Sequence, residues 1–276
     1  DVFPDAAVET GAITNARIIA VSRWLERVSY HRSDAVVVLS EDLRANVLAK
    51  IAPKHQHKVH VIPNFVDSDR ITPRDRMTSY REELRIGTEP VVMYAGNVGY
   101  SQSLTMMLHA VREMPEVTFV INGDGAARGE LERDAVGLSN IRFSGYQPAD
   151  RVAEVLATAD IHVVPLRAGL GAVSVPSKTY SILAAGRPVV AAIDAGTEVT
   201  RILAESGAGV SVSPDDPIAF TDALRAMVNS GSAATEAGAL GRLWVESHVS
   251  PARVANSYLD VIASLGVQQI ASILRG

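Results

Sequence analysis

From residue 90 onward, short runs of β-branched residues alternate with segments whose apolar residues recur at helical spacing. Such runs are typical of strands in a parallel sheet, because helices cover both faces of that sheet. The runs begin about 20–28 residues apart, which is the spacing of βα units. The alternation therefore predicts a doubly wound parallel α/β domain. The predicted strands are Val91–Tyr94, Val117–Ile121, Ile141–Phe143, Ile161–Val164, Val189–Ala192 and Val210–Val212. The predicted helices are Ser103–Glu113, Arg128–Val136, Ala149–Thr158, Ser177–Ala185, Glu198–Glu205 and Ile218–Val228.

The first 89 residues contain only two predicted strands, Ala35–Leu39 and Lys58–Ile62. A parallel sheet needs helices on both faces, and two strands cannot build such a unit alone. We therefore expect residues 1–89 to be the last part of an N-terminal Rossmann-like domain, followed by a linker. The helices predicted in this part are Ala6–Ser33, Glu41–Ile51 and Arg74–Leu84.

The rest of the chain is expected to form one complete domain over residues 90–248 and a C-terminal helix and tail over residues 249–276. The last helix is predicted over Ser250–Leu265. Ser250 suits its cap and Pro251 suits its first position, where a missing N–H costs nothing.

Composition excludes several classes of protein. A net charge of −5 argues against nucleic acid as the main partner, which would need a concentrated basic face. The absence of cysteine excludes disulfides and thiolate metal sites and fits a reducing compartment. No apolar run approaches the roughly 20 residues that cross a bilayer, and the first residues do not resemble a signal peptide. These features together lead us to expect a cytoplasmic chain. The seven histidines show no metal-ligand spacing, so we also expect that the chain binds no metal.

Glycine-rich turns follow four of the predicted strands. Ligands of open parallel sheets bind outside the carboxyl ends of the strands, and glycine lets a backbone approach them closely. A single turn of this kind is weak evidence, but a series on one edge favours a nucleotide or sugar-phosphate cleft. The candidate residues in these turns are Gly96, Asn97, Gly99, Gln102, Gly123, Asp124, Gly125, Gly145, Tyr146 and Arg167.

The segment Val175–Val190 adds a positive charge to the same edge. Pro176 and Ser177 suit a helix start, where free N–H groups attract anions, and Lys178 follows directly. Lysine is unusual in a first turn, which favours acidic residues. The segment therefore predicts a phosphate site at a helix entrance.

Several motifs, in chain order, resemble the retaining glycosyltransferases of the GT-B fold, of the family 4 type that builds bacterial polysaccharides. The matching motifs are Ser33-Asp34-Ala35, Leu39-Ser40, Val61 to Asp67, Tyr94-Ala95-Gly96-Asn97, Gly123-Asp124-Gly125, Ala159-Asp160 and Ala184 to Val190. The Gly-Asn-x-Gly and Pro-Ser-Lys pattern is similar to a subgroup in capsule, O-antigen and colanic-acid assembly. The resemblance implies a nucleoside-diphosphate sugar in the C-terminal domain and the acceptor in the N-terminal domain. It also implies about a hundred further residues upstream, so we expect an N-terminally truncated chain.

The chain departs from the family pattern at four positions. An Arg and a Lys that clamp the diphosphate in the family are replaced by Asn97 and Gln102. The two carboxylates of the family's Glu-x7-Glu motif fall on Val173 and Ser181. In similar enzymes the second Glu holds the ribose hydroxyls, a role that Ser181 could fill more weakly.

The resemblance implies a metal-independent transfer with retention to a polysaccharide or lipid-linked glycan, with the leaving phosphate as proton acceptor and no cofactor besides the donor. Departure of a nucleoside diphosphate builds negative charge that fixed cations and donors must stabilise. Lys178 and the amides of Ser177 and Lys178 are the first candidates for that role, and Arg167 is the second.

Each remaining candidate also has a purely structural interpretation. Asp124 could cap the turn between its glycines, and Asn97 could be a left-handed turn residue instead of a phosphate donor. Tyr146 could be a surface aromatic or lie near the nucleobase. Trp24, Arg27, His31 and Arg32 could belong to a solvated helix face, which we favour, or to a basic face that touches anionic lipid of the inner membrane.

Two other functions compete with sugar transfer. The lost carboxylates and cations would suit a non-catalytic nucleotide-binding or assembly module. A nucleotide-sugar epimerase of similar fold would be expected to place His and Glu in the cleft, and this sequence places none there.

Overall fold

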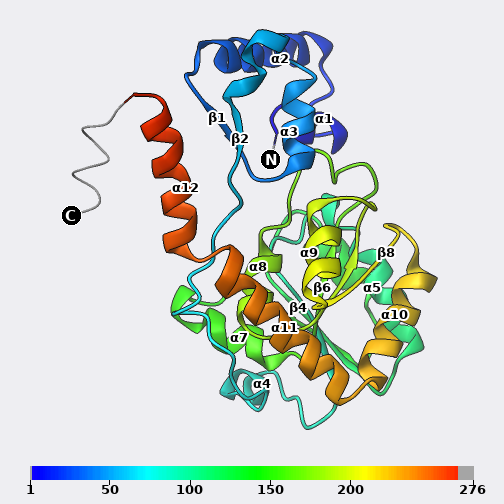
Figure 1. Ribbon diagram of the computed structural model, residues 1–276. Coiled ribbons are helices and arrows are strands. Elements are labelled where there is room, and N and C mark those ends of the chain that lie inside the picture. Colours follow the sequence, from blue (N-terminus) through cyan, green and yellow to red (C-terminus); the bar gives the residue numbers. More distant parts are fainter. Residues whose placement is uncertain (1, 267–276) are drawn as a thin grey trace.

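The computed structural model describes residues 2–266 and contains a six-stranded parallel sheet in the second part of the chain (Figure 1). The strands lie in the order β5-β4-β3-β6-β7-β8, and every neighbouring pair is parallel. This arrangement confirms the predicted doubly wound domain. The strands are β3 (Val91–Ala95), β4 (Thr118–Asn122), β5 (Ile141–Ser144), β6 (Ile161–Pro165), β7 (Val189–Ala192) and β8 (Gly209–Val212).

Two large apolar cores and a smaller one, which includes Tyr80, Met93 and Val155, cover the two faces of this sheet. One core includes Leu108 of α5, Leu131 of α6 and Phe220 of α10, packed against strand residues such as Phe119. The other large core includes Ile182 of α8 and Val245 of α11. The helices are α5 (Thr105–Glu113), α6 (Arg128–Asp134), α7 (Val152–Thr158), α8 (Lys178–Ala184), α9 (Glu198–Ser206), α10 (Pro217–Asn229) and α11 (Ser232–His248).

The N-terminal part is a smaller unit with two parallel strands, β1 (Val36–Val38) and β2 (Val59–Val61), and helix α3 (Glu41–Leu48). One long helix over Ala6–Ser33 was expected, and that prediction is wrong. The chain forms α1 (Asp5–Glu9) and α2 (Ala16–Arg32), separated by Gly11 at a φ of 74°. The Asn15 side chain accepts from the amides of Arg17 and Ile18 and starts a new helix.

A connecting segment runs from β2 along the second unit (Figure 1). The helix predicted over Arg74–Leu84 is wrong in its first half, because only α4 (Ser79–Glu83) is helical. Thr78 caps α4 by accepting from the amide of Arg81. The non-helical part before it lets Arg76 reach Asp160, with Nη1 2.9 Å from Oδ2.

Helix α11 was not predicted, yet it secures the connecting segment. Arg242 of α11 donates to the carbonyl oxygens of Ile71 and Ser68, at 2.6 and 2.9 Å, and also to that of Ala184. Helix α12 (Pro251–Ser264) follows, with Ser250 and Pro251 at the predicted positions. The expected tail over residues 267–276 lies outside the described residues.

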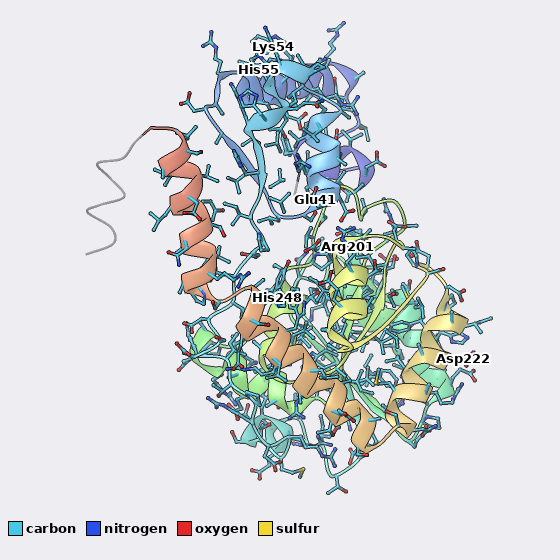
Figure 2. The ribbon with its side chains drawn as sticks, viewed as in Figure 1. Glu41, Lys54, His55, Arg201, Asp222 and His248 are labelled. Atoms are coloured by element: carbon cyan, nitrogen blue, oxygen red, sulfur yellow. The ribbon has the colours of Figure 1, made fainter. Side chains whose placement is uncertain are left out.

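Apolar and polar contacts join the two units, and Val175 of the second unit packs into the apolar core of the first. The amide of Val2 donates to Val173 O at 2.9 Å, and Arg167 donates to Glu9 O at 2.6 Å. An ion pair of 2.6 Å joins Arg201 of α9 to Asp42 of α3. Figure 2 shows Arg201 at the top of the second unit, close to the start of α3. Among residues 2–266, no helix has the length and apolar character needed to span a bilayer.

The close packing of α11 on α8 depends on Gly238, where a Cβ would lie 2.1 Å from Gly186 O. We expect Gly238→Ala to lower the free energy of unfolding by about 1–3 kcal/mol, because the helices must separate. The control is Gly129→Ala in α6, whose Cβ would meet only Arg133 Nη1 at 3.7 Å. That variant should be neutral or slightly more stable. Urea denaturation of both variants measures the difference, and equal stability would contradict the packing argument.

Candidate functional site

The glycine turns after β3, β4 and β5 stack on one another at the carboxyl edge of the sheet. Gly96 N donates to Asn122 O and Gly123 N donates to Ser144 O, each at 2.9 Å, so the sheet pairing continues into the turns. A Cβ at Gly123 would lie 1.8 Å from Gly96 O. These glycines therefore permit a backbone approach that no other residue allows.

The first glycine turn satisfies its own polar groups. Gln102 Oε1 accepts from the amide of Gly99 at 3.0 Å, so its carbonyl oxygen closes the turn. Asn97 is exposed, and its carbonyl oxygen accepts from the hydroxyl of Tyr94. Asn97 does not have the positive φ expected of a left-handed turn residue, so that interpretation is wrong.

Lys178, the first residue of α8, reaches back to this turn. Its Nζ donates to the hydroxyl of Tyr94 at 2.6 Å and lies 3.9 Å from the centre of the tyrosine ring. Because a Cβ at Gly96 would lie 2.9 Å from Nζ, glycine there leaves room for the ammonium group. The face of an aromatic ring attracts a cation, so Tyr94 binds the ammonium by both its ring and its hydroxyl.

Lys178 has no carboxylate partner among the ion pairs of residues 2–266. Burial lowers the pKa of Lys178 to about 7, because a charged amine loses hydration there. Burial raises the pKa of Tyr94, so its hydroxyl stays protonated and can donate to Asn97 O. The edge thus holds a cation whose charge an anionic ligand would stabilise.

A pocket of about 210 Å³ opens beside Lys178. It brings together four of the predicted site residues, Gly96, Tyr146, Lys178 and Ser181, with Asn122 and Gln147 as further polar groups. Val152, Val155, Leu156 and Ile182 supply apolar walls. Tyr146 is 61% exposed, and its hydroxyl donates to Asp124 O at 3.1 Å. No carboxylate lines this pocket.

Other predicted residues lie along the same edge but outside this pocket. Asp124 Oδ1 accepts from the amide of Gly125 at 2.7 Å. This bond fits the structural interpretation, in which Asp124 caps the turn between its glycines. Arg167 directs its guanidinium to Glu9 O in the N-terminal unit. The remaining residues that do not line the pocket are Asn97, Gly99, Gln102, Gly123, Gly125, Gly145 and Ser177.

Sequence reasoning did not identify Tyr94, Asn122 or Gln147. Asn122 Oδ1 accepts from the hydroxyl of buried Tyr80 at 2.5 Å, which fixes the amide at the floor of the pocket. Tyr94 and Asn122 occupy strand ends that read as ordinary core positions. Their sequence signal is only their position at the glycine turns, Tyr94 two residues before Gly96 and Asn122 directly before Gly123.

Comparisons with known protein families match both parts of the chain. The family model described as glycosyl transferases group 1 covers residues 89–230, more than half of the chain. A second model, described as glycosyltransferase family 4, covers residues 12–70.

Curated relatives include the probable glycosyltransferase WbjE of Pseudomonas aeruginosa, which is 28% identical over 80% of this chain and 56% of its own length. The putative colanic acid biosynthesis glycosyl transferase WcaI of Escherichia coli is 27% identical over 76% of this chain and 53% of its own length. The chain thus spans about half the length of these relatives.

Solved structures share the architecture. HepE of Anabaena, in complex with UDP and glucose, has a TM-score of 0.78 at 14% identity, over 88% of this chain and 67% of HepE. Sucrose-phosphate synthase of Thermosynechococcus elongatus has a TM-score of 0.76 at 18% identity, over 97% of this chain and 66% of that enzyme. These likenesses confirm the GT-B-like fold. The family match over residues 89–230 shows that this chain belongs to the group 1 glycosyltransferases.

Proposed function

We propose that the protein transfers a sugar from a nucleoside-diphosphate sugar to a polysaccharide or lipid-linked glycan, with retention and without a metal ion. The observation that carries the proposal is the partly buried Lys178 ammonium beside a pocket at the carboxyl edge of the sheet, with no carboxylate partner in the described part of the chain. The similarity to WcaI, a putative colanic acid biosynthesis glycosyl transferase, supports this class of product, and the UDP-glucose bound by HepE supports this class of donor.

The chemistry needs positive charge at the leaving group. Breaking the bond between the sugar and the diphosphate leaves negative charge on the departing oxygen. Lys178 donates one hydrogen bond to Tyr94, so two further ammonium protons remain for phosphate oxygens. The departing phosphate oxygen would take the proton of the acceptor hydroxyl. This scheme requires no acid–base pair from the protein.

The pocket beside Lys178 suits the nucleoside half of the donor. Tyr146 offers an aromatic face, and Asn122, Gln147 and Ser181 offer polar groups. Ser181 would contact a ribose hydroxyl through a single oxygen, where a carboxylate would offer two.

The acceptor would bind on the side of the N-terminal unit.

Helix α2 exposes Trp24, at 58%, on its surface, together with Arg27, His31 and Arg32. Contact of this face with anionic lipid remains a prediction, and solvation of the face remains the favoured alternative.

The central test removes the cation. Lys178→Ala should weaken UDP-glucose binding and, in a chain that includes the upstream part of the family, lower turnover by orders of magnitude. The control is Lys54→Ala, which deletes an exposed lysine of the N-terminal unit (Figure 2). Calorimetry and a sugar-transfer assay measure the two effects. Near-normal transfer by Lys178→Ala would refute the proposed role. Binding without transfer by the parent sequence in that longer chain would favour the non-catalytic module.

Donor binding should also depend on pH. Below pH 7 the Lys178 amine is protonated, and above it the free protein loses this charge. The dissociation constant for UDP-glucose should therefore rise by up to about tenfold per pH unit as the pH increases above 7. Lys178→Arg keeps its charge and should flatten the profile. A flat profile in the parent protein would contradict the assignment.

A further inference from the structure

The segment Arg167–Gly171, which follows β6, is held by two carboxylates from neighbouring strand ends. Asp194, after β7, accepts through Oδ2 from the amides of Gly169 and Gly171, at 2.9 and 3.2 Å. Asp215, after β8, accepts through Oδ2 from the amide of Ala168 at 3.1 Å. The backbone of this glycine-rich segment is therefore fixed by side chains from outside it.

Asp215 also binds a different turn. Its Oδ1 accepts from the hydroxyl of Ser103 at 2.5 Å, and Ser103 ends the first glycine turn, after β3. Thus the two oxygens of one carboxylate hold the turn after β3 and the segment after β6. A second contact joins the same two pieces, since Arg167 N donates to Ser101 O at 2.8 Å.

Both partners of the Ser103–Asp215 bond have strained backbones. Among residues 2–266, only three non-glycine residues have positive φ, and two of them are Ser103 (43°) and Asp215 (56°). Glycine would adopt these angles without strain, so the side chains are present at an energetic cost. Strain of this kind tends to persist where the surrounding contacts serve a function.

We propose that Asp215 is a positioning residue for the donor site, because it fixes the first glycine turn to the Arg167–Gly171 segment. This inference rests on the proposed function. The turn that Ser103 ends also carries the Asn97 carbonyl oxygen, which accepts from the hydroxyl that binds Lys178. Asp215 therefore acts on the donor through the glycine turn and touches no reacting atom.

The test uses Ser103→Gly, Asp215→Asn and the double variant, with Asp222→Asn on the surface of α10 as control (Figure 2). Ser103→Gly removes the hydroxyl and also relieves the strained φ, so thermal stability should not fall. Its dissociation constant for UDP-glucose should nevertheless rise about tenfold, the scale of losing one charge-assisted hydrogen bond. The double variant should bind no more weakly than the weaker single variant, because both remove one interaction.

Hydrogen exchange of the ligand-free protein supplies an independent measurement. Amides of residues 96–103 and 167–171 should exchange faster in Ser103→Gly and Asp215→Asn than in the parent and the Asp222→Asn control. Unchanged exchange, or parent-like affinity in Ser103→Gly, would overturn the proposal. If the parent protein binds no member of a panel of nucleoside-diphosphate sugars, the proposed function fails, and this inference falls with it. Parent binding with additive losses in the double variant would overturn the positioning role alone.

Discussion

The site depends on one lysine whose ammonium is partly buried and has no carboxylate partner among residues 2–266. The Lys178 ammonium lies over the ring of Tyr94 and donates to its hydroxyl, and burial lowers its pKa to about 7. A buried charge without a counter-ion is unfavourable, and an anion bound beside it would remove that cost. The same residue therefore costs stability in the free protein, and under the proposed function it would supply affinity for a diphosphate.

The glycine turns near this lysine give the site its backbone shape and offer few free amides to a ligand. The amides of Gly96, Val98, Gly99 and Gly125 already donate within the turns or across the sheet. Glycine is required at Gly123 because the neighbouring backbone lies where a Cβ would be. Because Gln102 accepts from the amide of Gly99 and closes the first glycine turn, we propose that Lys178 at the start of α8 supplies the cation.

The fold was largely predictable and the site only partly so. The strands are continuous β-branched runs, so their positions were found to within two residues. Helix α11 was missed because its sequence is rich in Ala and Gly and shows no clear helical spacing of large apolar residues. Its stability comes from packing against α8, where Gly238 permits a close approach. Lys178 was identified from its motif. The contribution of Tyr94 was not, because a core tyrosine and a cation-binding tyrosine look alike in a sequence until the fold brings the Lys178 ammonium to the ring.

A crystal structure of the chain with bound UDP tests the central claim most directly. The account predicts that a phosphate oxygen lies within hydrogen-bond distance of Lys178 Nζ, with the nucleoside in the pocket lined by Tyr146 and Ser181. A diphosphate bound elsewhere on the sheet edge, with Lys178 still bound only to Tyr94, would contradict it.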